Sequence, residues 1–219
     1  MLSLDIQTFI KEANVFSQTE SNHNEPSLFG VTDGKAIGTY LEQKFTSSLA
    51  QRYLFQLGSS ANGIDFPSLN TDMKTTSKRQ PQSSCPYQSA RQKIFGLGYN
   101  LIVFVYEKYD DVISKTGKLC ITDTVFVEAS RTADFQTTMG ILEILQRNGN
   151  KDDIIGFMIE RNLPVDEIGL NNLADEILIT PPEQGFLTIS NALQWRLQYT
   201  RIIEKAGKVQ GIHSVFKSV

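Results

Sequence analysis

The pattern of apolar and polar residues along the chain predicts a sheet with helices packed on it. Apolar residues recur at helical spacing within residues 1–14, residues 35–57 fit one long helix, and a further helix is expected over 87–95. Residues 100–106 form a continuous apolar run typical of a strand buried on both faces, and 119–128 form another strand. This order of helices and strands indicates an α/β or α+β fold with a mixed central sheet flanked by helices.

The pattern changes after about residue 134, where helical spacing becomes dominant. The polar stretch at 17–27 is expected to be a loop, and Ser190 is expected to cap a helix that contains Trp195. Beyond residue 134, the expected helices are 139–147, 152–161, 165–177 and 190–205, with a short strand over 185–189.

Composition narrows the class of protein. The 219 residues suffice for one large domain or a domain with a small appendage, and 40% of them are hydrophobic. No run approaches the ~20 apolar residues that span a bilayer, and the first residues lack the order of a signal peptide. We therefore expect a cytoplasmic protein with no membrane partner. The net charge of −3 gives no bulk attraction to nucleic acid, so any DNA contact must rest on a local basic surface.

Several kinds of chemistry are disfavoured. Only His23 and His213 are histidines, and both lie in polar segments near the ends of the chain. Zinc hydrolases, histidine-metal finger nucleases and Ser-His-Asp hydrolases need histidine beside a metal or a nucleophile. Glycine-rich phosphate loops are also missing from the sequence, so we expect no nucleotide cofactor.

One segment places two carboxylates and an amine together. Residues 63–76 are expected to form a hairpin or strand pair in which Asp72 and Lys74 project to one side while Met73 turns into the core. Asp65 then arrives from the preceding turn or short strand. Two carboxylates can hold magnesium, and an ammonium beside them can orient water or offset charge at phosphorus. The alternative is an exposed strand that carries a surface salt bridge.

The helix before this segment favours the first interpretation. Its apolar stripe of Ile37, Leu41 and Phe45 should face a sheet, and Glu42 lies next to that stripe. Small residues such as Gly38 allow close packing, which would bring Glu42 to the edge of the metal site.

Together these pieces resemble the PD-(D/E)xK endonuclease superfamily, in particular MutH-type nicking endonucleases and the restriction enzymes related to them. The resemblance covers about residues 30–76, roughly a fifth of the chain. It implies that Asp65 and Asp72 are metal ligands, that Lys74 is the catalytic lysine, and that Glu42 is an auxiliary acid bonded to Lys74 or to a water at the metal. The shared residues are Gly38, Glu42, Asp65, Phe66, Pro67, Leu69, Asp72, Lys74 and Thr75.

Two positions depart from the family pattern. Asp72 stands where the family more often has glutamate, which shortens the reach of the ligand by one methylene. Pro67 follows the first aspartate instead of preceding it, which matters little.

Polar and basic residues follow the candidate strand. Such side chains contact phosphates and base edges in protein–DNA complexes, whereas the alternative is a solvated polar loop. The expected DNA-binding residues are Lys78, Arg79, Gln80, Gln82, Ser83, Gln88 and Arg91, with Lys93 soon after.

The resemblance implies a type II restriction endonuclease that uses Mg2+ to cut double-stranded DNA at a short, palindromic sequence. A homodimer is expected, because one chain carries one candidate centre and a double-strand break needs two. Two alternatives stay open: a MutH-like repair endonuclease that nicks one strand, and a non-catalytic DNA-binding protein. In the first interpretation residues 1–134 form the endonuclease core, and 135–219 form a mainly helical part packed on the same domain.

Overall fold

The protein is described from a computed structural model, which covers residues 2–58, 63–189 and 196–218. The chain forms two compact units that interleave along the sequence. The first comprises residues 1–83, 100–127 and 202–219, and the second comprises 84–99 and 128–201. The expected division into an endonuclease core over residues 1–134 and a mainly helical part over 135–219 stays a prediction.

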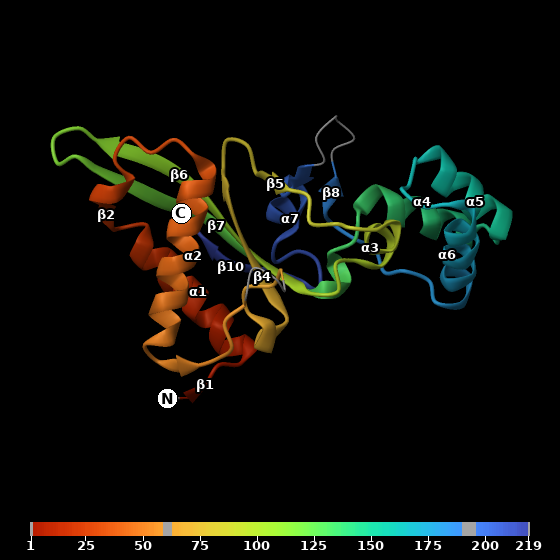
Figure 1. Ribbon diagram of the computed structural model, residues 1–219, viewed down its shortest axis with the longest axis horizontal. Coiled ribbons are helices and arrows are strands. Elements are labelled where there is room, and N and C mark those ends of the chain that lie inside the picture. The colour runs from red at the N-terminus through yellow and green to blue at the C-terminus, as the bar shows by residue number, and fades with distance from the viewer. Residues whose placement is uncertain (1, 59–62, 190–195, 219) are drawn as a thin grey trace. The chain divides into compact units, whose positions relative to one another are not determined.

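The first unit contains a mixed sheet and two long helices (Figure 1). Its elements are β1 (Leu2–Ser3), α1 (Ile6–Glu20), β2 (Asn24–Glu25), η1 (Pro26–Leu28), α2 (Gly34–Ala50), β3 (Tyr53–Leu54), η2 (Pro67–Leu69), β4 (Thr71–Ser77), β6 (Asn100–Asp111), β7 (Thr116–Val127) and β10 (Ile212–Lys217). Two elements cross the boundary between the units: β5 (Gln82–Ser84) and α7 (Thr200–Lys205).

The strands of this sheet follow the order β10-β7-β6-β4, with β2 also on β7. Strand β4 is parallel to β6, with Asp72 opposite Leu101 and Lys74 opposite Val103, and the other neighbours are antiparallel. Strand β6 is buried from Leu101 through Tyr106, as its continuous apolar run predicted. The expected mixed sheet flanked by helices is confirmed. Because β4 ends the row, one of its edges is left for other partners.

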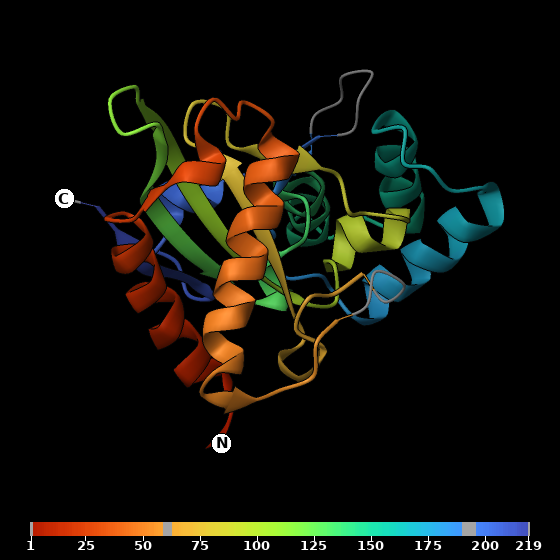
Figure 2. The same ribbon diagram turned by 60° about the vertical axis from the view of Figure 1, so that its left-hand side comes forward.

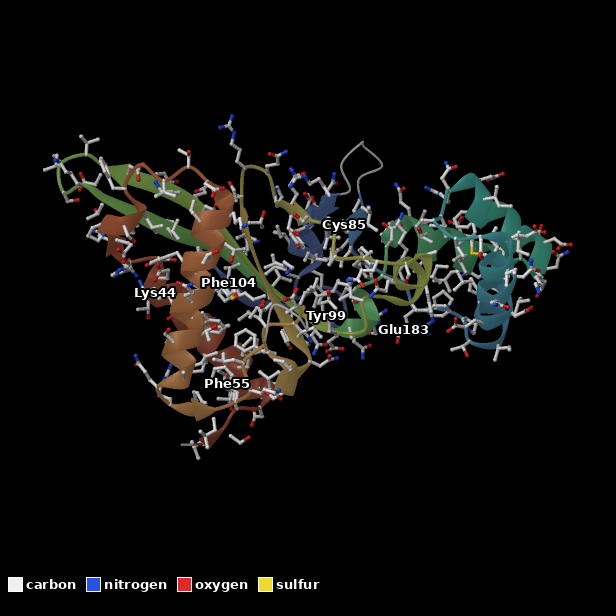
Figure 3. All side chains as sticks on the ribbon, viewed as in Figure 1. Lys44, Phe55, Cys85, Tyr99, Phe104 and Glu183 are labelled. Carbon is white, nitrogen blue, oxygen red and sulfur yellow. The ribbon has the colours of Figure 1, made fainter. Side chains whose placement is uncertain are left out.

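Helices α1 and α2 pack on one face of the sheet through an aromatic core (Figure 2). Phe45 of α2 is fully buried, and its ring centroid lies 5.5 Å from that of Phe9, 5.0 Å from Phe16, 6.1 Å from Phe66 and 5.4 Å from Phe104. Large buried rings contribute strongly to core stability, and tilted contacts of this kind add to it. Phe104 of β6 is labelled in Figure 3.

Helix α1 extends further than its apolar pattern predicted. Residues 17–20 were expected to begin a loop, and that expectation was wrong, because polar side chains there find partners inside the fold. The Ser17 hydroxyl lies 2.7 Å from that of Thr124, and buried Glu20 pairs with Lys44 of α2 at 2.8 Å. Lys44 is labelled in Figure 3. The polar end of α1 is thus bound to both α2 and the sheet.

Helix α2 ends earlier than expected, at Ala50 instead of residue 57. The chain then forms β3, which pairs in parallel with β1. Glu12 of α1 fixes this turn, because it pairs with Arg52 at 2.5 Å and accepts a hydrogen bond of 2.7 Å from the Tyr53 hydroxyl. These contacts join residues distant in sequence, so helical periodicity alone could not reveal the stop.

The second unit contains a helical cluster with its own core. The expected helix over 190–205 was wrong in its described part, where the chain forms a strand and then a short helix, α7; residues 190–195, including Ser190 and Trp195, lie outside the described residues. The elements of this unit are α3 (Ala90–Phe95), η3 (Ala129–Arg131), α4 (Phe135–Gln146), α5 (Lys151–Glu160), α6 (Glu167–Ile179), β8 (Thr188–Ile189) and β9 (Arg196–Gln198).

The aromatic core of the first unit should carry much of its stability. Phe45→Ala should lower the free energy of unfolding by about 3–5 kcal/mol, since the cavity lies among four other rings. Denaturant titration followed by circular dichroism measures this loss. Val15→Ala, at an exposed position of α1, is the matched control and should change stability by less than about 0.5 kcal/mol. Equal effects of the two substitutions would contradict this account of the core.

Candidate active site

Strand β4 presents Asp72 and Lys74 on the same side. The Lys74 ammonium lies 2.6 Å from Asp72 Oδ2, and Asp72 is only 2% exposed. Met73 between them is buried in the core with α1 and α2, as its alternation along the strand predicted. A surface salt bridge does not describe this pair, because the carboxylate is buried.

Asp65 reaches the same strand through a compact turn. The backbone N–H groups of Phe66 and Thr71 donate to each other's carbonyls at 3.0 and 3.2 Å, and Asn70 adopts a left-handed conformation with φ of 47°. This turn brings the Asp65 carboxylate back to β4, where its Oδ2 accepts a hydrogen bond of 2.8 Å from the Met73 N–H. This bond fixes the Asp65 carboxylate beside β4.

Glu42 comes to the site from α2. It is the most exposed of the four candidate residues, and its pKa is raised, first by partial burial and then by the negative charge of Asp65. The Lys74 ammonium acts in the opposite direction. A Cβ on Gly38 would meet Thr75 at 3.9 Å, an ordinary contact, so α2 lies close to β4 without requiring glycine there. The structure therefore brings Glu42, Asp65, Asp72 and Lys74 together.

Asp72 has a strongly altered acidity. Burial raises its pKa to about 7; the Lys74 ammonium opposes that rise, and the hydrogen bond and charge of Asp65 add to it. Two carboxylates that share a site in this way are costly to ionise together unless a cation joins them. The site therefore has the electrostatic character of one that binds a positive ion.

The donor set fits magnesium. No group of three or more histidine, cysteine, aspartate or glutamate side chains within the described residues forms a ready cage for a metal. Magnesium does not need such a cage, because it is commonly bound by one or two carboxylates together with waters and substrate phosphates. Asp65 and Asp72 supply two hard oxygen donors of this kind.

The expected DNA-binding residues of the first unit follow β4. A tight turn follows Ser77. The Thr76 hydroxyl stabilises this turn, because it accepts a hydrogen bond of 2.8 Å from the Gln82 N–H. Lys78 is paired with Glu107 at 3.5 Å, and Arg79 is exposed. Gln80 is exposed as well, and Ser83 is half-buried on β5.

A groove of about 730 Å3 lies beside this turn, wholly within the first unit. The segment before α2, the start of α2, the end of β4 and the outer half of β6 line it. Its basic side chains are Lys78, Arg79 and Lys108, and its aromatic ones are Tyr106 and Tyr109. The sequence placed the first two in a loop but contained no signal for the groove.

In the second unit, the expected DNA-binding residues already bond to other residues of the fold. Arg91 donates two hydrogen bonds from Nε, each 3.1 Å, and one of 2.6 Å from Nη2 to the Glu176 carboxylate, and it lies 4.9 Å from the Phe95 ring. The Gln88 N–H is bonded to the Gln92 side chain. Lys93, counted among the basic surface residues, is buried at 7% exposure near Asp134, so that expectation was wrong.

Comparisons with known proteins define the class. The family described as type II restriction enzyme NspV matches residues 3–214. A type II restriction enzyme, NspV of Nostoc sp. (strain ATCC 29411 / PCC 7524), is 61% identical over 218 residues, which cover 100% of this chain and 99% of NspV. No solved structure matches the chain.

The class of protein is therefore the type II restriction enzymes, as the sequence predicted. Within that class, the chain belongs to the NspV family. Matches of this extent favour a restriction enzyme over the repair nickase and over a non-catalytic DNA-binding protein. No helix within the described residues is long and apolar enough to cross a membrane.

The raised pKa of Asp72 makes stability depend on pH when metal is absent. The folded state holds this proton more tightly than the unfolded state, so stability should fall as pH rises from about 4 to about 7. Asp72→Asn should remove this cost and raise the free energy of unfolding at pH 8 by at least about 1.4 kcal/mol, the worth of one pKa unit. Thermal denaturation in a chelator measures the gain.

The same substitution should give no such gain at pH 4, where the wild-type carboxyl is already protonated. In saturating magnesium at pH 8 the stability gain of Asp72→Asn over wild type should shrink, because the ion binds and stabilises only the wild-type protein, which has both carboxylates. A gain of equal size at pH 4 and pH 8 would show that the charge of Asp72 is not its source.

Proposed function

We propose that this type II restriction enzyme hydrolyses phosphodiester bonds in double-stranded DNA with magnesium, at the site formed by Glu42, Asp65, Asp72 and Lys74. The observation that carries the proposal is the 2.6 Å contact between the Lys74 ammonium and the buried Asp72 carboxylate, with Asp65 bonded to the same strand. Because Asp72 is buried beside a second carboxylate, the pair is better suited to binding a cation than to a structural role alone.

Each side chain has a distinct task in this proposal. Asp65 and Asp72 would hold magnesium, which would polarise a phosphoryl oxygen and make water a stronger nucleophile. Lys74 orients the attacking water and offsets the negative charge that develops at phosphorus. Glu42, whose pKa is raised by partial burial and by the charge of Asp65, supports Lys74 and accepts the proton that the attacking water gives up.

The arrangement is similar to that of the PD-(D/E)xK endonucleases, which is the superfamily we assign on the strength of the site. Shared features are an acid and a lysine on one edge strand, a second acid from the turn before that strand, and a further acid from the preceding helix. The residues proposed to contact DNA are Lys78, Arg79, Gln80, Gln82 and Ser83 in the first unit, and Gln88 and Arg91 in the second.

Plasmid cleavage tests the function directly. Purified protein should convert supercoiled DNA to discrete linear fragments in magnesium and should leave it intact in a chelator. Asp72→Ala should lower the cleavage rate by at least about 100-fold, since it removes a metal ligand. Cleavage within tenfold of wild type would overturn the site, and nicked circles without linear fragments would identify a strand-nicking enzyme.

Lys74→Ala is compared with Asp72→Ala, because the two side chains are in contact but have different proposed roles. It should lose cleavage to a similar extent but keep DNA binding that magnesium stimulates, because the lysine acts on the reaction and does not hold the ion. Binding is measured by fluorescence anisotropy of a labelled duplex. If binding falls as much as the rate, Lys74 is a phosphate anchor and its catalytic role is wrong.

A homodimer that reads a palindromic site completes the proposal. One chain of 24.6 kDa carries one candidate centre, whereas a double-strand break needs one centre for each antiparallel strand. A twofold symmetric dimer presents both centres to a twofold symmetric sequence. Sedimentation of the protein with a short duplex that contains a mapped cleavage site should show two chains per duplex. One chain per duplex would contradict the dimer.

A further inference from the structure

The β6–β7 hairpin extends past the strands on either side of it. Pairing of β6 with β4 ends at Tyr106, and pairing of β7 with β10 ends at Asp123. Beyond these positions the two strands pair with each other as far as Asp111 and Thr116, and among the described strands only β2 joins them. We call residues 107–120 the ribbon; Figure 1 shows it as the green hairpin end beside β2.

The tip of the ribbon is an ordered turn with two apolar side chains in solvent. Val112 is 76% exposed and Ile113 is 96% exposed. The Asp111 carboxylate holds the turn, since it accepts hydrogen bonds of 2.9 Å from the Ile113 N–H and 2.8 Å from the Ser114 hydroxyl. The turn therefore presents its two largest apolar side chains outward in a fixed arrangement.

The acids around the ribbon already have partners within the fold. Glu107 pairs with Lys78 at 3.5 Å, Asp110 pairs with Lys108, and Asp111 is used by the turn. The pairs with Lys78 and Lys108 offset the charges of Glu107 and Asp110, whereas Asp111 is an exposed carboxylate that the turn holds in place.

Three cations near the ribbon remain available. Within the described part of the chain, Arg79, Lys115 and Lys118 form no ion pair. The ribbon and the turn after β4 together carry five basic and three acidic side chains, whereas the whole chain has a net charge of −3. When Glu25 of β2 is added, which lies opposite Gly117, this end of the first unit keeps an excess of one basic side chain. Together with Arg79, Lys115 and Lys118, this excess favours a polyanion over a second copy of an acidic chain.

Resting on the proposed cleavage of double-stranded DNA, the geometry points to the ribbon as a DNA contact element that enters a groove of the duplex beside the cut site. A two-stranded ribbon fits the major groove, and apolar side chains such as Val112 and Ile113 can contact thymine methyl groups there. Lys115 and Lys118 would meet the phosphates that border the groove.

The sheet register limits where this contact lies. Lys74 is opposite Val103, and Ile113 stands ten positions after Val103 along β6 and the turn. At about 3.4 Å per residue the tip lies at most about 34 Å along the strand from the site, close to one turn of B-DNA or about 10 base pairs. Any contact made by the tip therefore falls within about 10 base pairs of the cut, and the proposal places it beyond the first 5 or so, so that a duplex that ends there loses the contact.

This length dependence gives a sharp experiment. Cleavage is measured as kcat/KM on two duplexes that contain the same mapped cleavage site, one extending about 15 and the other about 5 base pairs to each side, chosen around the span of about 10. The double substitution Val112→Ser with Ile113→Ser should lower kcat/KM about 10-fold on the long duplex and less than about twofold on the short one. Equal loss on both, or no loss on either, overturns the inference.

Two further variants separate the possible causes. Ile168→Ser with Ile179→Ser, at sites 73% and 82% exposed on α6, is the matched control and should cleave both duplexes like wild type. Lys115→Ala with Lys118→Ala should reduce the salt dependence of binding to the long duplex by about one phosphate contact per lysine. An unchanged salt dependence counts against the phosphate contacts.

Sedimentation of the Val112→Ser and Ile113→Ser variant identifies the rival occupant. The oligomeric state should match that of wild type, and dissociation would show that the tip contacts a second copy of the chain, which overturns the DNA assignment. Wild-type protein that cuts neither duplex nor plasmid would instead refute the proposed function, so the two failures are distinguishable.

Discussion

The hydrogen bond from the Met73 N–H to the Asp65 carboxylate joins the fold of the first unit to its candidate chemistry. Strand β4 ends the row of the sheet, and an unpaired edge N–H needs an acceptor. Asp65 supplies that acceptor, and in doing so it is fixed beside Asp72. One hydrogen bond therefore both satisfies the edge of the sheet and places the two carboxylates side by side.

That arrangement has an electrostatic cost which the rest of the site must offset. Asp72 is buried, and its pKa rises to about 7 because burial and Asp65 both disfavour its charge, although Lys74 counteracts them. A buried carboxylate with only one close cation is stabilised further by a second positive charge. The aromatic core around Phe45 holds β4 and α2 in place, so packing provides the stability that the charged site lacks.

Local patterns in the sequence predicted the parts of the site that lie within one element. Alternation along β4 was enough to place Asp72 and Lys74 on one side with Met73 in the core, and the stripe of α2 was enough to place Glu42 near them. Contacts between distant segments could not be predicted in this way. The end of α2 depends on Glu12, the end of α1 depends on Lys44, and the burial of Lys93 depends on the fold of the second unit.

The register between β4 and β6 links the candidate site to the ribbon. The same two strands carry the site near the start of β4 and the groove at its end, and β6 then continues alone with β7 into the ribbon. Backbone pairing fixes each residue of β4 against β6, and it fixes β6 against β7 apart from one irregularity between Val105 and Tyr106. A one-residue slip of β4 would turn Asp72 and Lys74 into the aromatic core and would bring Met73 to the site. Burial of Met73 with Phe66 and Phe104 opposes that slip, so the apolar face of β4 also determines where the charged face lies relative to the DNA contact proposed for the ribbon.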